Sequence, residues 1–326
     1  MEEITLKIRD IAKEHLSNRK VDKILGFSKG DFPYESCPVF ISDIDEIETL
    51  IWDLFCVNNL SKYLIEELKT TEKIGVFIKG CDSLSFNQIV QDNRINPENV
   101  VIFGVPCNGM LDPKKIKKMG LLKGIMDVQR DEENVIFVTK NGENNISAKE
   151  VKYDKCILCE NPNPVVFDEI IGNKITKKVD QEDKFQDVEE IEAMSADEKF
   201  DYWSNQFSKC VRCYACRNIC PACNCQKCIF ENVESGVSSK AKVDSEDQFF
   251  HIIRAYHVAG RCVDCGECSR VCPEGIPLEK LNKKIIKDIT QLYGEYDAGL
   301  SSKGKSTLTT YDLEDIDPFE IPKGRK

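Results

Sequence analysis

Apolar positions near the start of the chain follow helical spacing. One set comprises Ile4, Ile8, Ile11 and Ala12, and a second set, after the capping candidates Asp43 and Asp45, comprises Ile47, Leu50, Ile51 and Leu54. Residues three and four apart share one face of a helix, so each set predicts an amphipathic helix with its apolar face in the core.

The pattern then changes to short apolar runs. Residues 73–115 read KIGVFIKGCDSLSFNQIVQDNRINPENVVIFGVPCNGMLDPKK, with a helical stretch between two runs that each end near a Gly. This order predicts a βαβ unit with parallel strands. Asp112 and Pro113 suit the N-cap and first position of a following helix. We therefore expect an α/β domain with a parallel βαβ core over residues 1–175.

Three further segments complete the expected organisation. Residues from 135 to 151 predict a hairpin that turns at Asn141 and Gly142. Residues 176–200 are acidic and predict a solvated connection between domains, with an acidic docking surface as the alternative. Residues 301–326 are polar and rich in Gly, Ser and Lys at their start, which predicts an extended C-terminal tail.

Composition and charge narrow the classes of function. The chain is 41% apolar and 31% charged, and no stretch of it approaches the roughly 18 apolar residues that a membrane span needs. The N-terminal MEEITLKIRD lacks the apolar segment of a secretory signal, so we expect a cytoplasmic protein without membrane insertion. A formal net charge of -11 argues against nucleic acid as a partner and suits docking on other proteins.

Seventeen cysteines dominate the candidate chemistry, and an odd number in a chain this long favours metal ligation over disulfides. The pattern C-x2-C-x2-C-x3-C-P occurs twice, ending at Pro221 and at Pro273. Three closely spaced thiolates hold three corners of a [4Fe-4S] cubane, and the fourth Cys reaches the other cluster. The repeat predicts two cubanes, one held by Cys210, Cys213, Cys216 and Cys272 and the other by Cys262, Cys265, Cys268 and Cys220. Zinc is the alternative, although zinc sites seldom repeat a four-cysteine run.

A third cubane follows as a hypothesis. Cys81 and Cys107 each lie just past the carboxyl end of a predicted strand, and parallel strands bring such residues to one edge of the sheet. Cys156 and Cys159 form a CxxC that the dicluster does not need. These four thiols are expected to meet at that edge.

The two motifs and the group at the sheet edge leave three cysteines without an assigned cluster, namely Cys223, Cys225 and Cys228. They are candidates for a further cluster or a zinc site with a remote ligand such as Cys37 or Cys56, and Cys225 and Cys228 are also competitors for the third cluster. Buried free thiols, which pack as small hydrophobes, are the remaining alternative.

The stretch between the two motifs predicts helices. Phe200, Trp203 and Phe207 form one helical stripe, and Phe249, Ile252, Ile253 and Tyr256 form another. Arg254, His257 and Arg261 share the opposite face of the second helix and are expected to be solvated, with a cluster-tuning role as the alternative. His251 and His257 face differently and are not a metal pair. Residues 201–300 thus resemble the helical dicluster modules of heterodisulfide reductase and succinate dehydrogenase iron-sulfur subunits.

A second resemblance covers residues 70–175. GCDSLSF at 80–86, GVPCNGM at 104–110 and CILCENPNPVVFDEIIG at 156–172 are similar to motifs in the β subunits of coenzyme F420-reducing hydrogenase and formate dehydrogenase. The resemblance implies a [4Fe-4S] site at Cys81, Cys107, Cys156 and Cys159. That family also binds FAD through a region that includes GG-x-x-T. Residues 20–40 of this chain offer only GFSKGDFPYESCP, which argues against FAD.

These observations favour an iron-sulfur electron-transfer subunit of a larger anaerobic oxidoreductase complex. It would relay single electrons through three or more clusters and dock on catalytic and flavoprotein subunits of a formate dehydrogenase, a hydrogenase or a heterodisulfide-reductase-like complex, with ferredoxin as a further candidate partner. No nucleophile and base are recognisable. The alternatives are an FAD-containing subunit that exchanges electrons with deazaflavin or nicotinamide, and a zinc-stabilised interaction protein.

Overall fold

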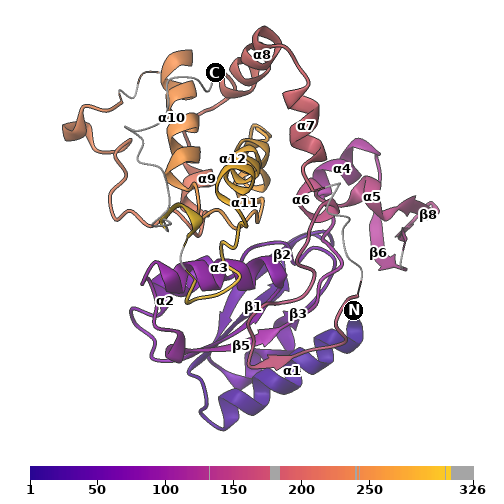
Figure 1. Cartoon of the computed structure of the whole chain (residues 1–326). Coiled ribbons are helices and arrows are strands. Elements are labelled where there is room, and N and C mark those ends of the chain that lie inside the picture. The colour runs from indigo at the N-terminus through magenta and orange to yellow at the C-terminus, as the bar shows by residue number, and fades with distance from the viewer. Residues whose placement is uncertain (132, 177–183, 239–240, 242, 305, 310–326) are drawn as a thin grey trace.

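A computed structural model describes residues 1–131, 133–176, 184–238, 241, 243–304 and 306–309 of the chain. An α/β part contains the first 175 residues, and a mainly helical part follows it (Figure 1). The expected combination of an α/β fold with a helical C-terminal region is confirmed. The domain boundaries themselves stay a prediction.

One mixed sheet organises the α/β part. Its strand order is β2-β1-β4-β5-β9, and β3 pairs with β1. The strands are β1 (Lys23–Lys29), β2 (Ser36–Ile41), β3 (Leu50–Ile51), β4 (Ile74–Ile78), β5 (Val100–Gly104) and β9 (Glu169–Ile170). β1, β4, β5 and β9 run parallel, whereas β2 and β3 are antiparallel to β1. The pairing of β1 with β2 was not anticipated from the sequence.

The predicted βαβ unit is confirmed, and it joins β4 to β5 through α3 (Gly80–Gln91). The turn into α3 packs tightly against the segment that follows the CxxC. A Cβ at Gly80 would lie 1.8 Å from the carbonyl oxygen of Asn161, so only glycine allows this approach. Asp112 caps α4 (Pro113–Lys118) as expected, and its side chain accepts from the N–H of Lys114.

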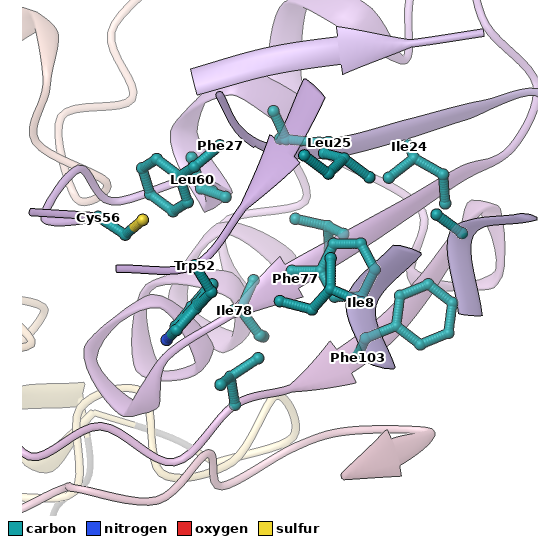
Figure 2. Packing of buried hydrophobic residues seen from close by; sticks show 14 of the residues in the cluster. Ile8, Ile24, Leu25, Phe27, Trp52, Cys56, Leu60, Phe77, Ile78 and Phe103 are labelled. Atoms are coloured by element: carbon teal, nitrogen blue, oxygen red, sulfur yellow. The ribbon is translucent and has the colours of Figure 1, made fainter. Parts of the chain in front are cut away.

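The first predicted helix is confirmed as α1 (Glu2–Ser17), which buries Ile8, Ala12 and Leu16. The second is wrong as a regular helix. Residues 44–49 form a 3-10 turn, η1 (Ile44–Thr49), and the chain then extends as β3, whose pairing with β1 replaces further helical bonds. The apolar residues of this second predicted helix still lie in the core. Figure 2 shows this core around Phe27, Trp52, Phe77 and Phe103.

A small antiparallel sheet stands beside the main one. It contains β6 (Ile125–Arg130), β7 (Asn134–Thr139) and β8 (Gly142–Ser147), and α5 (Ala148–Val151) follows. The predicted hairpin is β7–β8. Thr139 pairs with Gly142, so the residues between them, Lys140 and Asn141, make the turn. Shorter elements are η2 (Ser61–Tyr63), α2 (Leu64–Glu67), η3 (Pro97–Asn99) and α6 (Asp154–Ile157).

The helical part comprises α7 (Gln186–Glu192), α8 (Ala196–Phe207), α9 (Ala215–Asn218), η5 (Val233–Ser235), α10 (Asp244–His257), α11 (Glu267–Arg270), α12 (Leu278–Tyr293) and η6 (Thr307–Thr309). The acidic stretch is structured where it is described. Glu189 and Glu192 of α7 both pair with Lys287 of α12, at 3.0 and 2.6 Å. These carboxylates therefore bind the protein's own helix. Residues 177–183 of the stretch lie outside the described residues.

The buried face of α10 differs from the predicted one. Phe249, Ile252 and Tyr256 of the predicted apolar stripe are 39%, 42% and 65% exposed. The buried residues are Asp247, Phe250, His251, Arg254 and Ala255. The expectation that Arg254 is solvated is wrong, because its side chain is buried and donates to the carbonyl oxygen of Cys216.

The start of the C-terminal tail lies on the α/β part. Asn87 and Gln91 of α3 donate to the carbonyl oxygens of Gly299 and Ser301, at 2.8 and 2.7 Å. Residues 310–326 of the expected tail lie outside the described residues. Among the helices that are described, none is long and apolar enough to cross a membrane.

Candidate metal centres

The first cavity of interest brings together thiols from both cysteine motifs. Cys210, Cys213 and Cys216 line it together with Cys272, the last cysteine of the second motif. Phe250, Ile276 and Leu278 supply apolar walls. The predicted exchange of the fourth cysteine between the motifs requires that Cys272 lie beside the first motif in this way.

The two motifs repeat each other in backbone conformation as well as in sequence. Arg212 and Tyr214 in the first motif, and Asp264 and Gly266 in the second, occupy equivalent positions and all have positive φ, between 51° and 65°. Non-glycine residues rarely adopt this conformation, and its recurrence at functional sites is common. It turns the N–H of Arg212 toward Cys210 Sγ, at 3.4 Å. A short helix then begins in each motif, α9 and α11.

The second group of thiols contains Cys262, Cys265, Cys268 and Cys220. Cys220 belongs to a small buried cluster against which Cys262 packs. Burial raises the pKa of Cys262 to about 12, and the neighbouring Cys220 contributes to this rise. Burial likewise raises the pKa values of Cys265 and Cys268, again with a contribution from Cys220. The four thiols thus lie near enough in the interior for the charge of Cys220 to act on the other three.

The third group lies at the predicted sheet edge. Cys81, Cys107, Cys156 and Cys159 line one cavity of about 60 Å³ between the α/β part and the second motif. Backbone N–H groups point at these sulfurs: Gly109 donates to Cys107 Sγ at 3.3 Å, and Met110 to Cys156 Sγ at 3.5 Å. Burial raises the pKa of Cys107 to about 11 and that of Cys159 to about 12. The four thiols predicted at this edge therefore line one cavity, and their role as ligands of one cluster stays a prediction.

The second and third groups adjoin each other. Cys265 of the second motif lines the same cavity as the four thiols of the third group. An ion pair stands at this junction, in which Lys155 Nζ lies 2.5 Å from Glu267 Oε1 with both side chains buried. Burial opposes the charge on Glu267, yet Lys155 and Arg270 hold its pKa at about 2.

Sequence reasoning did not identify the charged residues of these sites. Lys155 directly precedes Cys156, and Glu267 directly precedes Cys268, so their positions beside ligand candidates were the available signal. Lys79 is 2% exposed, lines the cavity of the third group and pairs with Asp82 at 2.9 Å.

The unassigned thiols line a larger cavity, and one of them, Cys223, packs against the buried cluster of Cys220 beside Cys262. Cys223, Cys225 and Cys228 line a cavity of about 740 Å³ between the two parts, together with Lys62, Arg94, Arg217, Arg254 and Arg261. Cys37 and Cys56 do not line it: Cys37 lies on β2, and Cys56 is buried in the sheet's core. The structure thus does not bring these two to the unassigned thiols.

The donor set of each group consists of thiols, which both zinc and iron-sulfur clusters use. Within the described ranges, no three His, Cys, Asp or Glu side chains converge closely enough to hold one metal ion. A zinc ion would draw its thiolates to about 2.3 Å from a common centre. A cubane instead binds each thiolate at a separate iron, so its ligands stand further apart.

Comparisons with known proteins agree with this chemistry. Residues 206–276 match the family model of a 4Fe-4S dicluster domain. The β subunit of an F420-dependent formate dehydrogenase from Methanocaldococcus jannaschii is 26% identical over 86% of this chain and 88% of its own length. Subunit β of F420-dependent formate dehydrogenase 1 from Methanococcus maripaludis is 24% identical over 88% and 89%.

A chain of the F420-reducing [NiFe] hydrogenase complex from Methanosarcina barkeri matches with a TM-score of 0.39 and 17% identity over 49% of this chain and 58% of that one. The sequence relatives and the dicluster domain confirm the resemblance to β subunits of F420-dependent formate dehydrogenases. They also confirm the predicted class of function, an iron-sulfur electron-transfer subunit.

Proposed function

We propose that this chain relays single electrons through three [4Fe-4S] clusters inside an oxidoreductase complex. The first cluster would be held by Cys210, Cys213, Cys216 and Cys272, the second by Cys262, Cys265, Cys268 and Cys220, and the third by Cys81, Cys107, Cys156 and Cys159. The observation that carries the proposal is the position of Cys265, which lines the cavity of the third group while belonging to the second motif. The second and third clusters would therefore adjoin, and the exchanged cysteines Cys220 and Cys272 would link the second cluster to the first.

The residues fit the role of cluster ligands. In each group the donors are thiols, and soft thiolates are the ligands that iron-sulfur clusters use. Burial raises the pKa of Cys107 to about 11 and that of Cys262 to about 12, so binding a cluster would release the protons of these two thiols. When bound, the clusters supply one-electron transfer. The chain's own contribution is to fix their spacing, exclude water and set the local charge.

The relatives' names indicate the kind of complex. Both are subunits of F420-dependent formate dehydrogenases. Formate or hydride oxidation releases two electrons together, which requires a flavin, a molybdopterin or a metal-hydride centre. We propose that a catalytic subunit for formate and a flavoprotein subunit are the partners, with ferredoxin as a further electron carrier. Anaerobic co-purification followed by identification of the bound subunits tests this choice against a hydrogenase or a heterodisulfide-reductase-like partner.

The relay itself is tested with the isolated protein. Anaerobically purified protein should be brown, accept electrons from dithionite and pass them to a dye, yet oxidise neither formate, hydrogen, reduced nicotinamide nor reduced deazaflavin without its partner. A colourless protein that carries zinc would contradict the relay. Released FAD together with substantial turnover of these donors would replace the relay with a flavoenzyme.

A further inference from the structure

Arg254 is a buried cation without a carboxylate partner among the described residues. Only 4% of its surface is exposed. Its Nη2 donates to the carbonyl oxygen of Cys216 at 2.8 Å, and its Nε has no hydrogen-bond partner. A buried charge is costly unless another charge compensates it, so the absence of a carboxylate requires an explanation.

Four other cations near these thiols do have carboxylate partners. Arg212 Nε lies 2.5 Å from Asp247 Oδ1, and Arg270 Nη2 lies 2.7 Å from Glu267 Oε2. At the third group, Lys79 pairs with Asp82 and Lys155 with Glu267. The lack of a carboxylate partner therefore distinguishes Arg254 from these four cations.

The negative charge around Arg254 comes from cysteines of both motifs. The guanidinium of Arg254 contacts the first set at the carbonyl oxygen of Cys216, and Cys220 and Cys268 of the second set are near enough for their charge to act on it. Cys216 belongs to the first proposed cluster, and the other two belong to the second. α10 thus places one guanidinium between the two ligand sets.

Lys62 approaches the second set from the α/β part. Its Nζ donates to the carbonyl oxygen of Cys223 at 3.0 Å, and no ion pair with a carboxylate is found for it in the part of the chain that the structure describes. Cys220 is among the charges that act on it. Lys62 therefore adds positive charge beside the second set but has no contact with a ligand of the first.

We propose that Arg254 is the shared counter-charge of the first and second clusters, and that it raises the reduction potentials of both. This inference rests on the proposed ligand sets. A cluster with four thiolates is anionic and gains a further negative charge on reduction, so a buried cation stabilises the reduced form more than the oxidised form. Lys62 adds a smaller effect on the second cluster alone. The charges that act most strongly on Cys81, Cys107 and Cys159 do not include Arg254, so the third cluster lies outside this influence.

Redox titration of the full-length, cluster-loaded protein, followed by electron paramagnetic resonance, tests the inference. In Arg254→Gln, the ratio of reduced to oxidised first and second clusters at the wild-type midpoints should fall about tenfold, equivalent to about 59 mV for one electron. Arg254→Lys keeps the charge and should recover most of the shift. The third cluster should titrate as in the wild type and serves as an internal reference.

Arg261→Gln is the matched control. Arg261 lines the same large cavity, but its charge is paired with Asp92 at 3.1 Å, so its loss should leave all midpoints unchanged. If Arg254→Gln carries all clusters with unchanged midpoints, the inference is overturned. If Arg254→Gln fails to assemble the dicluster, Lys62→Gln provides the test. A lower reduction potential of the second cluster alone supports the inference, and an unchanged reduction potential refutes it. Wild-type protein without cubane signals would instead refute the proposed function.

Discussion

Lys155 and Glu267 form a buried ion pair of 2.5 Å that joins the α/β part to the helical part, and each residue directly precedes a proposed cluster ligand. Glu267 also pairs with Arg270 and accepts a hydrogen bond from the N–H of Asn59, at 3.3 Å. One carboxylate thus connects both parts of the protein at the junction of the second and third groups. The relative position of these groups depends on it.

Glu267→Gln should destabilise the protein by about 3 kcal/mol, because removing one partner of a buried pair leaves an uncompensated charge. The unfolding temperature of the cluster-loaded protein measures this loss. Glu3→Gln removes an exposed ion pair with Lys7, which solvent screens so that it adds little to stability, and serves as the control. Equal unfolding temperatures for the two variants would contradict a role for Glu267 in joining the parts.

Cys107→Ala should remove the third cluster. Iron content should fall from about twelve to about eight per chain, while the signals of the dicluster persist. Cys37→Ala is the matched control, since Cys37 lies on β2 and lines none of the three cysteine cavities. Unchanged iron in Cys107→Ala would exclude this residue as a ligand.

Exchange of ligands between the two motifs predicts crossed effects. Cys220→Ala should disturb the signal of the cluster at Cys262, Cys265 and Cys268, and Cys272→Ala should disturb the signal of the other. The reason is that the fourth cysteine of each motif lies beside cysteines of the other motif. Spectra of the two variants distinguish the patterns, and loss of the signal from each variant's own motif would reverse the assignment.

Sequence alone predicted the features that depend on local spacing. Parallel strands β4 and β5 place Cys81 and Cys107 at one edge because strand direction fixes where each strand ends. The repeated cysteine pattern predicted both motifs and the match to a dicluster domain for the same reason. The fold class and the broad function followed from these two patterns.

Features that depend on distant partners were not predicted. The inner face of α10 is polar because Asp247 pairs with Arg212 and His251 stacks on Phe207, with ring centroids 4.8 Å apart. Periodicity counts apolar residues and therefore selected the wrong face. Lys155 and Glu267 are 112 residues apart, so no local pattern indicates their contact.

The three unassigned thiols predict a further metal site. If Cys223, Cys225 and Cys228 bind metal, the purified protein should carry iron or zinc beyond the content of three cubanes, and Cys225→Ala should lose that excess. Cys225 suits the test because it is exposed and its truncation leaves the core intact. Elemental analysis of both proteins measures the difference. Equal metal content would identify these cysteines as free thiols.

Glu279 should make stability depend on pH. Burial raises the pKa of this carboxyl to about 7, Asp154 adds to the rise, and Lys280 and Lys283 oppose it. Its Oε2 has no hydrogen-bond partner. Because the folded pKa lies above the unfolded value, the folded state holds the proton more tightly, and the stability that this gives is present below about pH 4.5 and lost as pH rises through about 7.

Glu279→Gln removes this titration and isolates its effect from that of other groups. Between about pH 5.5 and about pH 8, the wild type should lose about 1–2 kcal/mol more stability than the variant. Thermal unfolding of both proteins at the two pH values measures the difference. Bound clusters would add negative charge near Cys268 and push the pKa of Glu279 in the same direction. Parallel pH profiles for the two proteins would show that Glu279 is solvated and titrates as an ordinary carboxyl.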